Sequence, residues 1–446
     1  MDPAKLSARL RDLVRKERRP APAQGDQPVR EERGGTASTL EAVLGGAWID
    51  DAGDACFVVE REFRGGRLHG SRPIASYAER AGEALRHLPV LCGASGLPAG
   101  GPMLFLDLET TGLSGGAGTQ AFLVGCGAFD DGAFRTRQFF LTAYPAERAM
   151  LGAVARRLAE AGALVTFNGK TFDLPIVETR YLFHRMAPPH TGLPHLDLLH
   201  PARRLWQSRN EAEPGGEGSC ALGVLETAIL GVRREGDVPG FDIPPRYFHY
   251  IRSGDAGPLE AVFEHNRLDL LSLALLTIHV LQLIGNGPDA ARDARECLAL
   301  GRVYERAGIL DRAEACYLRA AGLSGPRLAA SGSLVQIEAL RALAVRQRRD
   351  RRFDEAARRW EQVLEIGPCP PAIAREAREA LAIHHEHRSR NLLAAQRFAL
   401  QALGDVTRQR REEAVRYRLS RLERKIAAAG GRVGHPTLSL GVEKND

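Results

Sequence analysis

The residues best suited to chemistry are Asp107 and Glu109, two acids separated by one leucine in the short apolar run at 103–109. Such a run predicts a buried strand, and residues two apart on a strand project from the same side. Two neighbouring buried carboxylates repel each other and lose hydration. A divalent cation such as Mg²⁺ or Mn²⁺, which prefers oxygen ligands, would relieve that cost. The alternative is that both acids lie at the solvated end of the strand.

Two later segments carry further polar side chains of the same kind. Asp173 follows Asn168-Gly-Lys-Thr-Phe at a predicted strand-to-helix junction, where an aspartate also commonly serves as a helix N-cap. His265 and Asp269 are four residues apart near the start of a very apolar helix predicted over 259–285, so they share one face of it. An unpaired acid in so apolar a helix is costly, which indicates that Asp269 has a partner.

The elements that must position these residues form an α/β pattern. Asp130-Asp131-Gly132 separates two apolar runs and predicts a hairpin. Together with the strand at 103–109 it gives three antiparallel strands, which are followed by alternating helices and strands. This order predicts a mixed sheet flanked by helices. The helices are expected at 146–161, 173–186 and 259–285, and the later strands at 163–169 and 196–200.

Strand patterns end near Gly287, and the remaining sequence predicts helices. Three of these helices repeat a small residue followed four positions later by an aromatic one: Ala313 and Tyr317, Ala356 and Trp360, and Ala394 and Phe398. This spacing lets helix pairs pack closely and resembles tetratricopeptide repeats. The steps between the alanines are 43 and 38 residues, longer than the usual repeat of about 34. A plain helical bundle is the alternative.

Composition excludes several classes of protein. The 446 residues are 44% hydrophobic and 26% charged, which excludes a disordered chain and a polybasic one. The net charge of +6 permits a nucleic-acid partner without requiring one. Seven scattered cysteines without a Cys-x-x-Cys pair fit a reducing, cytoplasmic location. No run of 18 apolar residues is present, so we expect no membrane span. The arginine-rich stretch at 407–425 predicts a salt-bridged, solvated helix rather than a phosphate-binding surface.

Three motifs in order carry a family resemblance: Asp-x-Glu-Thr-Thr-Gly at 107–112, Asn-Gly-Lys-x-Phe-Asp at 168–173 and His-Asn-x-x-Asp. They resemble the exonuclease motifs of the DEDD superfamily, which has a ribonuclease H-like fold. More closely, residues 103–280 resemble the YprB-type ribonuclease H-like domain, whose members commonly carry a tetratricopeptide-like C-terminal region. Further matching segments are Gly115–Gly125, His195–His200, Arg203–Trp206 and Asp237–Gly240.

The resemblance implies a role for each motif residue. Asp107, Glu109, Asp173 and Asp269 would hold two divalent ions, Mg²⁺ or Mn²⁺, and His265 would be the general base that activates water. Two ions about 3.5–4 Å apart stabilise both the attacking and the leaving oxygen in phosphodiester hydrolysis. The implied activity is a nuclease, a 3′–5′ exonuclease on single-stranded DNA or RNA.

Other expectations concern substrate and partners. Thr110, Asn168 and Lys170 are the expected substrate-binding residues, with solvation the alternative for Lys170. Asp197 either contacts substrate or braces the sheet, and bracing is favoured. The helical repeats would bind a protein partner. The alternative function is a nucleic-acid-binding or protein-binding scaffold whose ribonuclease H-like domain has little or no activity.

One departure from the family pattern concerns His265. In DEDD exonucleases with a catalytic histidine, that residue usually precedes the last aspartate by five positions, whereas His265 precedes Asp269 by four. Four is the spacing of the group with a catalytic tyrosine. His265 therefore projects at a different helical angle from the histidine at the five-residue position.

The expected architecture is an α/β ribonuclease H-like mixed sheet flanked by helices, followed by an all-α helical-repeat domain. The expected segments are an N-terminal helix and flexible linker at 1–45, a small β-containing unit at 46–100, the ribonuclease H-like domain at 101–286, helical repeats at 290–430 and a flexible tail at 431–446.

Overall fold

The computed structural model describes residues 39–51, 54–64, 66–93, 100–112, 118–207, 220–323, 330–403 and 409–430. The described residues from Thr39 onward belong to one compact unit. Of the N-terminal helix and linker expected at 1–45, residues 1–38 lie outside the described residues, and so does the tail expected at 431–446.

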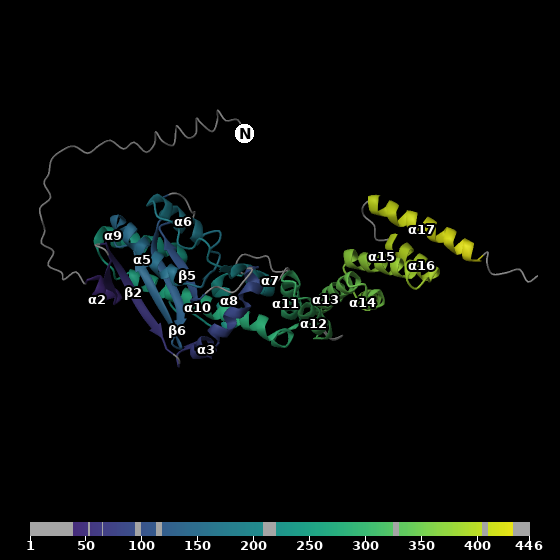
Figure 1. The fold of residues 1–446 in the computed structure, drawn as a ribbon, viewed down its shortest axis with the longest axis horizontal. Coiled ribbons are helices and arrows are strands. Elements are labelled where there is room, and N and C mark those ends of the chain that lie inside the picture. The colour runs from purple at the N-terminus through teal and green to yellow at the C-terminus, as the bar shows by residue number, and fades with distance from the viewer. Residues whose placement is uncertain are drawn as a thin grey trace, which may run out of the picture. The chain divides into compact units, whose positions relative to one another are not determined.

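A seven-stranded mixed sheet forms the N-terminal half of the described chain (Figure 1). Its strand order is β1-β2-β7-β6-β5-β8-β9, antiparallel from β1 to β5 and parallel from β5 to β9. The predicted mixed sheet is therefore confirmed. The strands are β1 (Ala47–Asp51), β2 (Asp54–Phe63), β5 (Met103–Thr110), β6 (Ala121–Asp130), β7 (Ala133–Phe140), β8 (Ala163–Thr166) and β9 (His195–Asp197), with β3 (Leu68–His69) and β4 (Arg72–Pro73) in a separate two-stranded ribbon.

The predicted hairpin between β6 and β7 is also confirmed. Asp130 pairs with Ala133 across the turn, and the two intervening residues have positive φ angles, 45° at Asp131 and 73° at Gly132. Two consecutive positive φ angles are typical of the tight turns that match the twist of the flanking strands, which explains the Asp-Gly sequence.

The expectation of a separate β-containing unit at 46–100 is wrong. Strand β2 pairs along its length with β7, from Phe57 opposite Phe140 to Phe63 opposite Phe134, so β1 and β2 extend the main sheet. The physical reason is that β7 would otherwise expose an unpaired edge, and the apolar residues of β2 become buried against the sheet's own core.

Helices cover both faces of the sheet, and their positions follow from the alternation along β5. Leu104, Leu106 and Leu108 belong to one hydrophobic cluster with residues of α5, whereas Met103 and Phe105 belong to another with most of α10. The helices of this half are α2 (Leu40–Leu44), α3 (Ala75–Ala84), α4 (Leu88–Cys92), α5 (Glu147–Ala159), α6 (Asp173–Phe183), α7 (Leu199–Trp206), α8 (Leu222–Leu225), α9 (Ile243–Ser253) and α10 (Leu259–Asn286).

Helix α10 is the long apolar helix predicted at 259–285. Although the sequence has no uninterrupted apolar run of membrane-spanning length, α10 is long and apolar enough by mean hydropathy to cross a membrane, and among the described residues it alone meets that test. However, 72% of its most apolar 18-residue window is buried inside the protein. This burial is what the core helix of a folded domain requires.

The rest of the described chain is helical, as predicted. Successive helices pack against each other, and Tyr317 and Trp360 are buried while Phe398 stacks on His385. Gly301 lies directly against the ring of Tyr317. The helices are α11 (Ala294–Arg306), α12 (Leu310–Leu323), α13 (Ala330–Arg349), α14 (Phe353–Glu365), α15 (Pro371–His387), α16 (Leu392–Leu403) and α17 (Gln409–Gly430).

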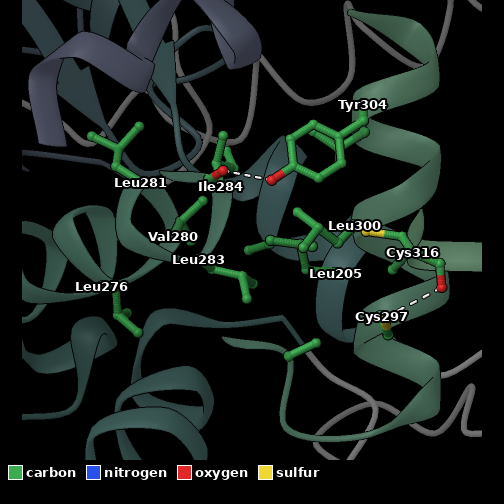
Figure 2. Packing of buried hydrophobic residues seen from close by; sticks show 14 of the residues in the cluster. Leu205, Leu276, Val280, Leu281, Leu283, Ile284, Cys297, Leu300, Tyr304 and Cys316 are labelled. Atoms are coloured by element: carbon green, nitrogen blue, oxygen red, sulfur yellow. Dashed lines mark hydrogen bonds between the residues drawn. The ribbon is translucent and has the colours of Figure 1, made fainter. Parts of the chain in front are cut away.

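The hydrophobic core continues from α10 into the helical half. Figure 2 shows Val280, Leu283 and Ile284 of α10 facing Leu300 and Tyr304 of α11 within one cluster. The hydroxyl of Tyr304 donates a hydrogen bond to the carbonyl of Ile284, near the end of α10. The expected boundary at 286–290 therefore separates two kinds of secondary structure but not two separate cores.

The close approach of α11 and α12 predicts a cost for a larger residue at position 301. A Cβ there would lie 2.5 Å from the Tyr317 ring, so Gly301→Ala should destabilise the chain by about 1–3 kcal/mol through overpacking. Gly322→Ala, also in a helix but with nothing within 4 Å, is the matched control and should be neutral or stabilising by up to about 1 kcal/mol. Urea denaturation measures both. Equal effects of the two substitutions would contradict the packing argument.

Helix α17 should detach at acidic pH. Glu386 of α15 is buried and pairs with three basic residues of α17, Arg418, Arg421 and Lys425. Burial opposes ionisation, but hydrogen bonds from Lys425 and Arg421 lower the pKa of Glu386 to about 2. Because the pKa is depressed, the stabilisation is complete above the ordinary value near 4.5 and is lost as the pH falls from there through 2.

Hydrogen exchange of α17, corrected for intrinsic rates, should therefore accelerate as the pH falls over this range. Glu386→Gln should give faster exchange already at neutral pH. Glu376→Gln, which removes an exposed pair with Arg341, is the control and should leave α17 unchanged. Exchange in α17 that is the same in Glu386→Gln and wild type would contradict the prediction.

Candidate metal-dependent active site

Strand β5 places Asp107 and Glu109 on the same face. Leu106 and Leu108 are 1% and 7% exposed on the opposite face, as the strand period predicts. Glu109 is itself buried, at 9% exposure, and Asp107 is partly buried. The alternative that both acids lie at a fully solvated strand end is therefore excluded.

A short turn between β8 and α6 brings Asp173 to the site. Asn168 has a φ of 64°, a conformation that asparagine tolerates. Asp197 at the end of β9 holds this turn, because its carboxylate accepts hydrogen bonds from the backbone N–H groups of Asn168 (2.8 Å), Lys170 (3.1 Å) and Leu199 (3.2 Å). The favoured interpretation of Asp197 as a brace thus agrees with its contacts.

Helix α6 begins at Asp173, with Phe172 in the capping position, so Asp173 is not the N-cap. The helix is anchored to α5 by a buried ion pair, in which Nε of Arg180 donates to Oε1 of Glu147 at 2.6 Å. Asp173 is 6% exposed. Its position is therefore determined by two fixed supports, the Asp197 turn and the Glu147 ion pair.

Helix α10 contributes Asp269, His265 and a residue that sequence reasoning missed, Asn266. The fully buried Asn266 amide donates from Nδ2 to Oδ2 of Asp107 at 2.8 Å, and its Oδ1 accepts from Gln138 at 2.8 Å. Gly125 of β6, which pairs with Asp107, permits this contact, because a Cβ at that position would lie 2.2 Å from Oδ1 of Asn266. Asn266 therefore fixes α10 against β5 at the site.

The carboxylates share one electrostatic environment. Burial, followed by the negative charges of Asp269, Glu109 and Asp173, raises the pKa of Asp107 well above its usual value. Burial and then Asp269, Asp173 and Asp237 do the same to the pKa of Glu109. Burial and Asp197 raise the pKa of Asp173 to about 7. The structure thus brings the four predicted acids close enough to repel one another.

A second cluster adjoins the first and was also missed. Nη2 of Arg234 donates to Oδ1 of Asp269 at 2.5 Å and to Oε2 of Glu226 at 2.8 Å, and Nη1 donates to Oδ2 of Asp237 at 3.1 Å. Nδ1 of His265 lies 2.7 Å from Oδ1 of Asp237. The segment Asp237–Gly240 is one of those that match the family, and this match could have marked Asp237 as a site residue. Nothing in the sequence pattern marked Arg234 or Glu226.

The donor set suits a hard divalent cation. All four predicted ligands are carboxylates, and their mutual repulsion is the condition that such an ion relieves. However, among the described residues no group of three or more acidic, histidine or cysteine side chains is arranged to hold a metal ion. The chemistry of the residues nevertheless fits a divalent metal ion.

The three predicted substrate-binding residues have different surroundings. Thr110 is buried, and its hydroxyl donates to the carbonyl of Gly112 at 2.9 Å, so it shapes the turn after β5. Asn168 and Lys170 are exposed beside Asp173. Oδ1 of Asn168 accepts from the hydroxyl of Thr171 at 2.8 Å. A substrate role for Asn168 and Lys170 stays a prediction.

Comparisons with known proteins bear on the same region. The profile of the RNase H superfamily matches residues 104–281, which contain all four acids and His265. A Bacillus subtilis (strain 168) protein named "Uncharacterized protein YprB" is 31% identical over 331 residues, which cover 73% of this chain and 75% of that protein. The chain belongs to the YprB family of the RNase H superfamily. Membership of this superfamily supports a nuclease-like domain and suggests binding of nucleic acid. Members of the superfamily typically use divalent metals.

The brace formed by Asp197 generates a prediction. Asp197→Asn removes the charge from an acceptor of three backbone N–H groups, so we expect about 2–3 kcal/mol of destabilisation together with faster hydrogen exchange at 168–173. It should also lower the pKa of Asp173, since the charge of Asp197 contributes to raising it. Urea denaturation and a carboxylate NMR titration measure these effects. Asp130→Asn, at an exposed ion pair with Arg135, is the control. An unchanged pKa of Asp173 would contradict the assignment.

Proposed function

We propose that the chain is a metal-dependent nuclease that hydrolyses phosphodiester bonds, acting as a 3′–5′ exonuclease on single-stranded DNA or RNA. The observation that carries this proposal is the electrostatic coupling of Asp107, Glu109 and Asp173 with Asp269, from three different elements of an RNase H superfamily domain. A buried set of like charges is unfavourable by itself. Divalent cations bound there would offset the repulsion and could contact a substrate phosphate at the same time.

The acids would hold two divalent ions, Mg²⁺ or Mn²⁺. When bound, such ions neutralise phosphate charge and stabilise the attacking and leaving oxygens. The chain's own residues do the rest. Asp107 and Glu109 project from the rigid centre of the sheet, Asp173 is held by the braced turn, and Asp269 by α10. Asn266 keeps the Asp107 carboxylate oriented through its amide.

His265 is proposed as the general base. Its Nδ1 lies 2.7 Å from Asp237, so the tautomer with a proton on Nδ1 donates to that carboxylate and leaves Nε2 free to accept a proton from water. Nε2 lies 3.5 Å from Oδ2 of Asp269, next to the acids proposed as ligands. The contact with Asp237 supports this role despite the four-residue spacing between His265 and Asp269.

Substrate and partners follow from the surroundings of the site. The exposed side chains of Asn168 and Lys170, beside Asp173, are proposed to contact a backbone phosphate. The helices from α11 onward are proposed to be degenerate tetratricopeptide-like repeats that bind a protein partner, an interpretation supported by the Gly301–Tyr317 packing. Free thiols at all seven cysteines support the proposed cytoplasmic location.

A second candidate function is a nucleic-acid-binding or protein-binding scaffold with a weakly active or inactive domain. The observation in its favour is that Arg234 already neutralises Asp269, together with the lack of a ready-made metal group among the described residues. Catalysis distinguishes the two functions.

Incubation with single-stranded DNA and RNA labelled at either the 3′ or the 5′ end tests the proposal. Wild type with Mn²⁺ or Mg²⁺ should shorten strands from the 3′ end, and a chelator should abolish the reaction. Asp107→Asn should lower the rate by at least about a hundredfold, because loss of metal-based charge stabilisation is worth several kcal/mol in the transition state.

Asp130→Asn, at the exposed hairpin turn, provides the control and should retain full activity. Intact substrate with wild type, or equal degradation by wild type and Asp107→Asn, would reject the nuclease and favour the scaffold.

A further inference from the structure

Arg234 is an internal cation next to the acidic site. Its guanidinium contacts three carboxylates, those of Asp269, Glu226 and Asp237, and its side chain is only 10% exposed. Burial alone would lower the pKa of Arg234, but the attraction of Asp269 and Glu226 raises it above its usual value. A positive charge is therefore always present here.

This charge is not shared evenly among the four predicted ligands. Both oxygens of Asp269 face nitrogen atoms, with Oδ1 at 2.5 Å from Arg234 and Oδ2 at 3.5 Å from His265. Asp107 instead accepts a hydrogen bond from the neutral amide of Asn266. Within the described part of the chain, neither Glu109 nor Asp173 forms an ion pair. Of the four predicted ligands, Asp269 thus has a cationic partner, and the other three have none among the described residues.

We propose that Arg234 holds the place of one of the two divalent ions, so that the free chain binds one ion tightly and admits a second only when the guanidinium releases Asp269. This inference rests on the proposed function and specifies its ion requirement. A second dication would face both the first ion and the guanidinium, and charges a few ångströms apart repel strongly near a protein interior. The Asp269 carboxylate cannot bind the guanidinium of Arg234 and a divalent ion at full strength at the same time.

Arg234 can release Asp269 without losing its remaining partners. Glu226 is 3% exposed and lies in a π-helical turn, Glu226–Leu230. Its Oε2 also accepts from the buried hydroxyl of Ser272 at 2.5 Å, and that hydroxyl lies 2.8 Å from Nε2 of His69. Glu226 is therefore anchored by a contact that does not involve Asp269, and it retains the guanidinium together with Asp237.

Counting bound ions tests the inference. Mn²⁺ is titrated into the chelator-treated full chain by isothermal titration calorimetry, and electron paramagnetic resonance distinguishes one bound ion from a spin-coupled pair. Wild type should bind one ion tightly and a second weakly. Arg234→Gln should bind two, with the second at least about tenfold tighter than in wild type, because a unit charge a few ångströms away is removed. Arg234→Lys keeps the charge and should behave as wild type.

Arg234→Gln leaves Glu226 buried without its cation, so the double variant Glu226→Gln/Arg234→Gln provides a second test with that charge removed, and it should also bind two ions. Arg135→Gln, which removes an arginine paired with Glu62 and Asp130 on β7, is the control and should bind as wild type.

The outcomes separate this inference from the proposed function. Two ions of comparable affinity in wild type, or an unchanged second affinity in both variants that lack Arg234, would overturn the role of Arg234 and leave the nuclease proposal intact. Failure of every variant to bind Mn²⁺ would overturn the proposed function as well.

Discussion

Negative charge gathered at one buried face of the sheet is the constraint on which the rest of the structure depends. A buried carboxylate is tolerated only with compensation from hydrogen bonds or opposite charge. Asn266 compensates Asp107 and Arg234 compensates Asp269. Burial and the neighbouring carboxylates nevertheless raise the pKa values of Asp107, Glu109 and Asp173. The fold therefore holds together a site that a cation would stabilise.

Apolar packing supplies the stability that makes this arrangement possible. Full burial of one leucine or isoleucine side chain contributes about 1.5–3 kcal/mol, and α10 buries many of them. The sheet, α6 and α10 are thus held in place by contacts distant from the acids, and repulsion among the acids is not free to separate them. Gly125 and Asp197 act in the same direction, the first by allowing close approach of α10 and the second by holding the turn that precedes Asp173.

The same helix joins the site to the helical half. The first turns of α10 carry His265 and Asp269, and its last turns pack on Leu300 and Tyr304 of α11 in a single hydrophobic cluster (Figure 2). The side chains of the site and the start of the helical region are therefore supported by one rigid element. This arrangement explains why secondary structure changes near Gly287 while the core does not end there.

Local periodicity in the sequence was enough to predict the sheet, the Asp-Gly hairpin, α10 and the common face of Asp107 and Glu109, because strand and helix periods set side-chain direction within a few residues. It did not predict that β1 and β2 would join the main sheet, since strand pairing depends on which edge is free. Nor did it reveal the contacts of Arg234, Asn266 and Glu226. The contacts of those residues join positions far apart in the sequence. Only the tertiary packing decides which charges become neighbours and which carboxylates have no cationic partner.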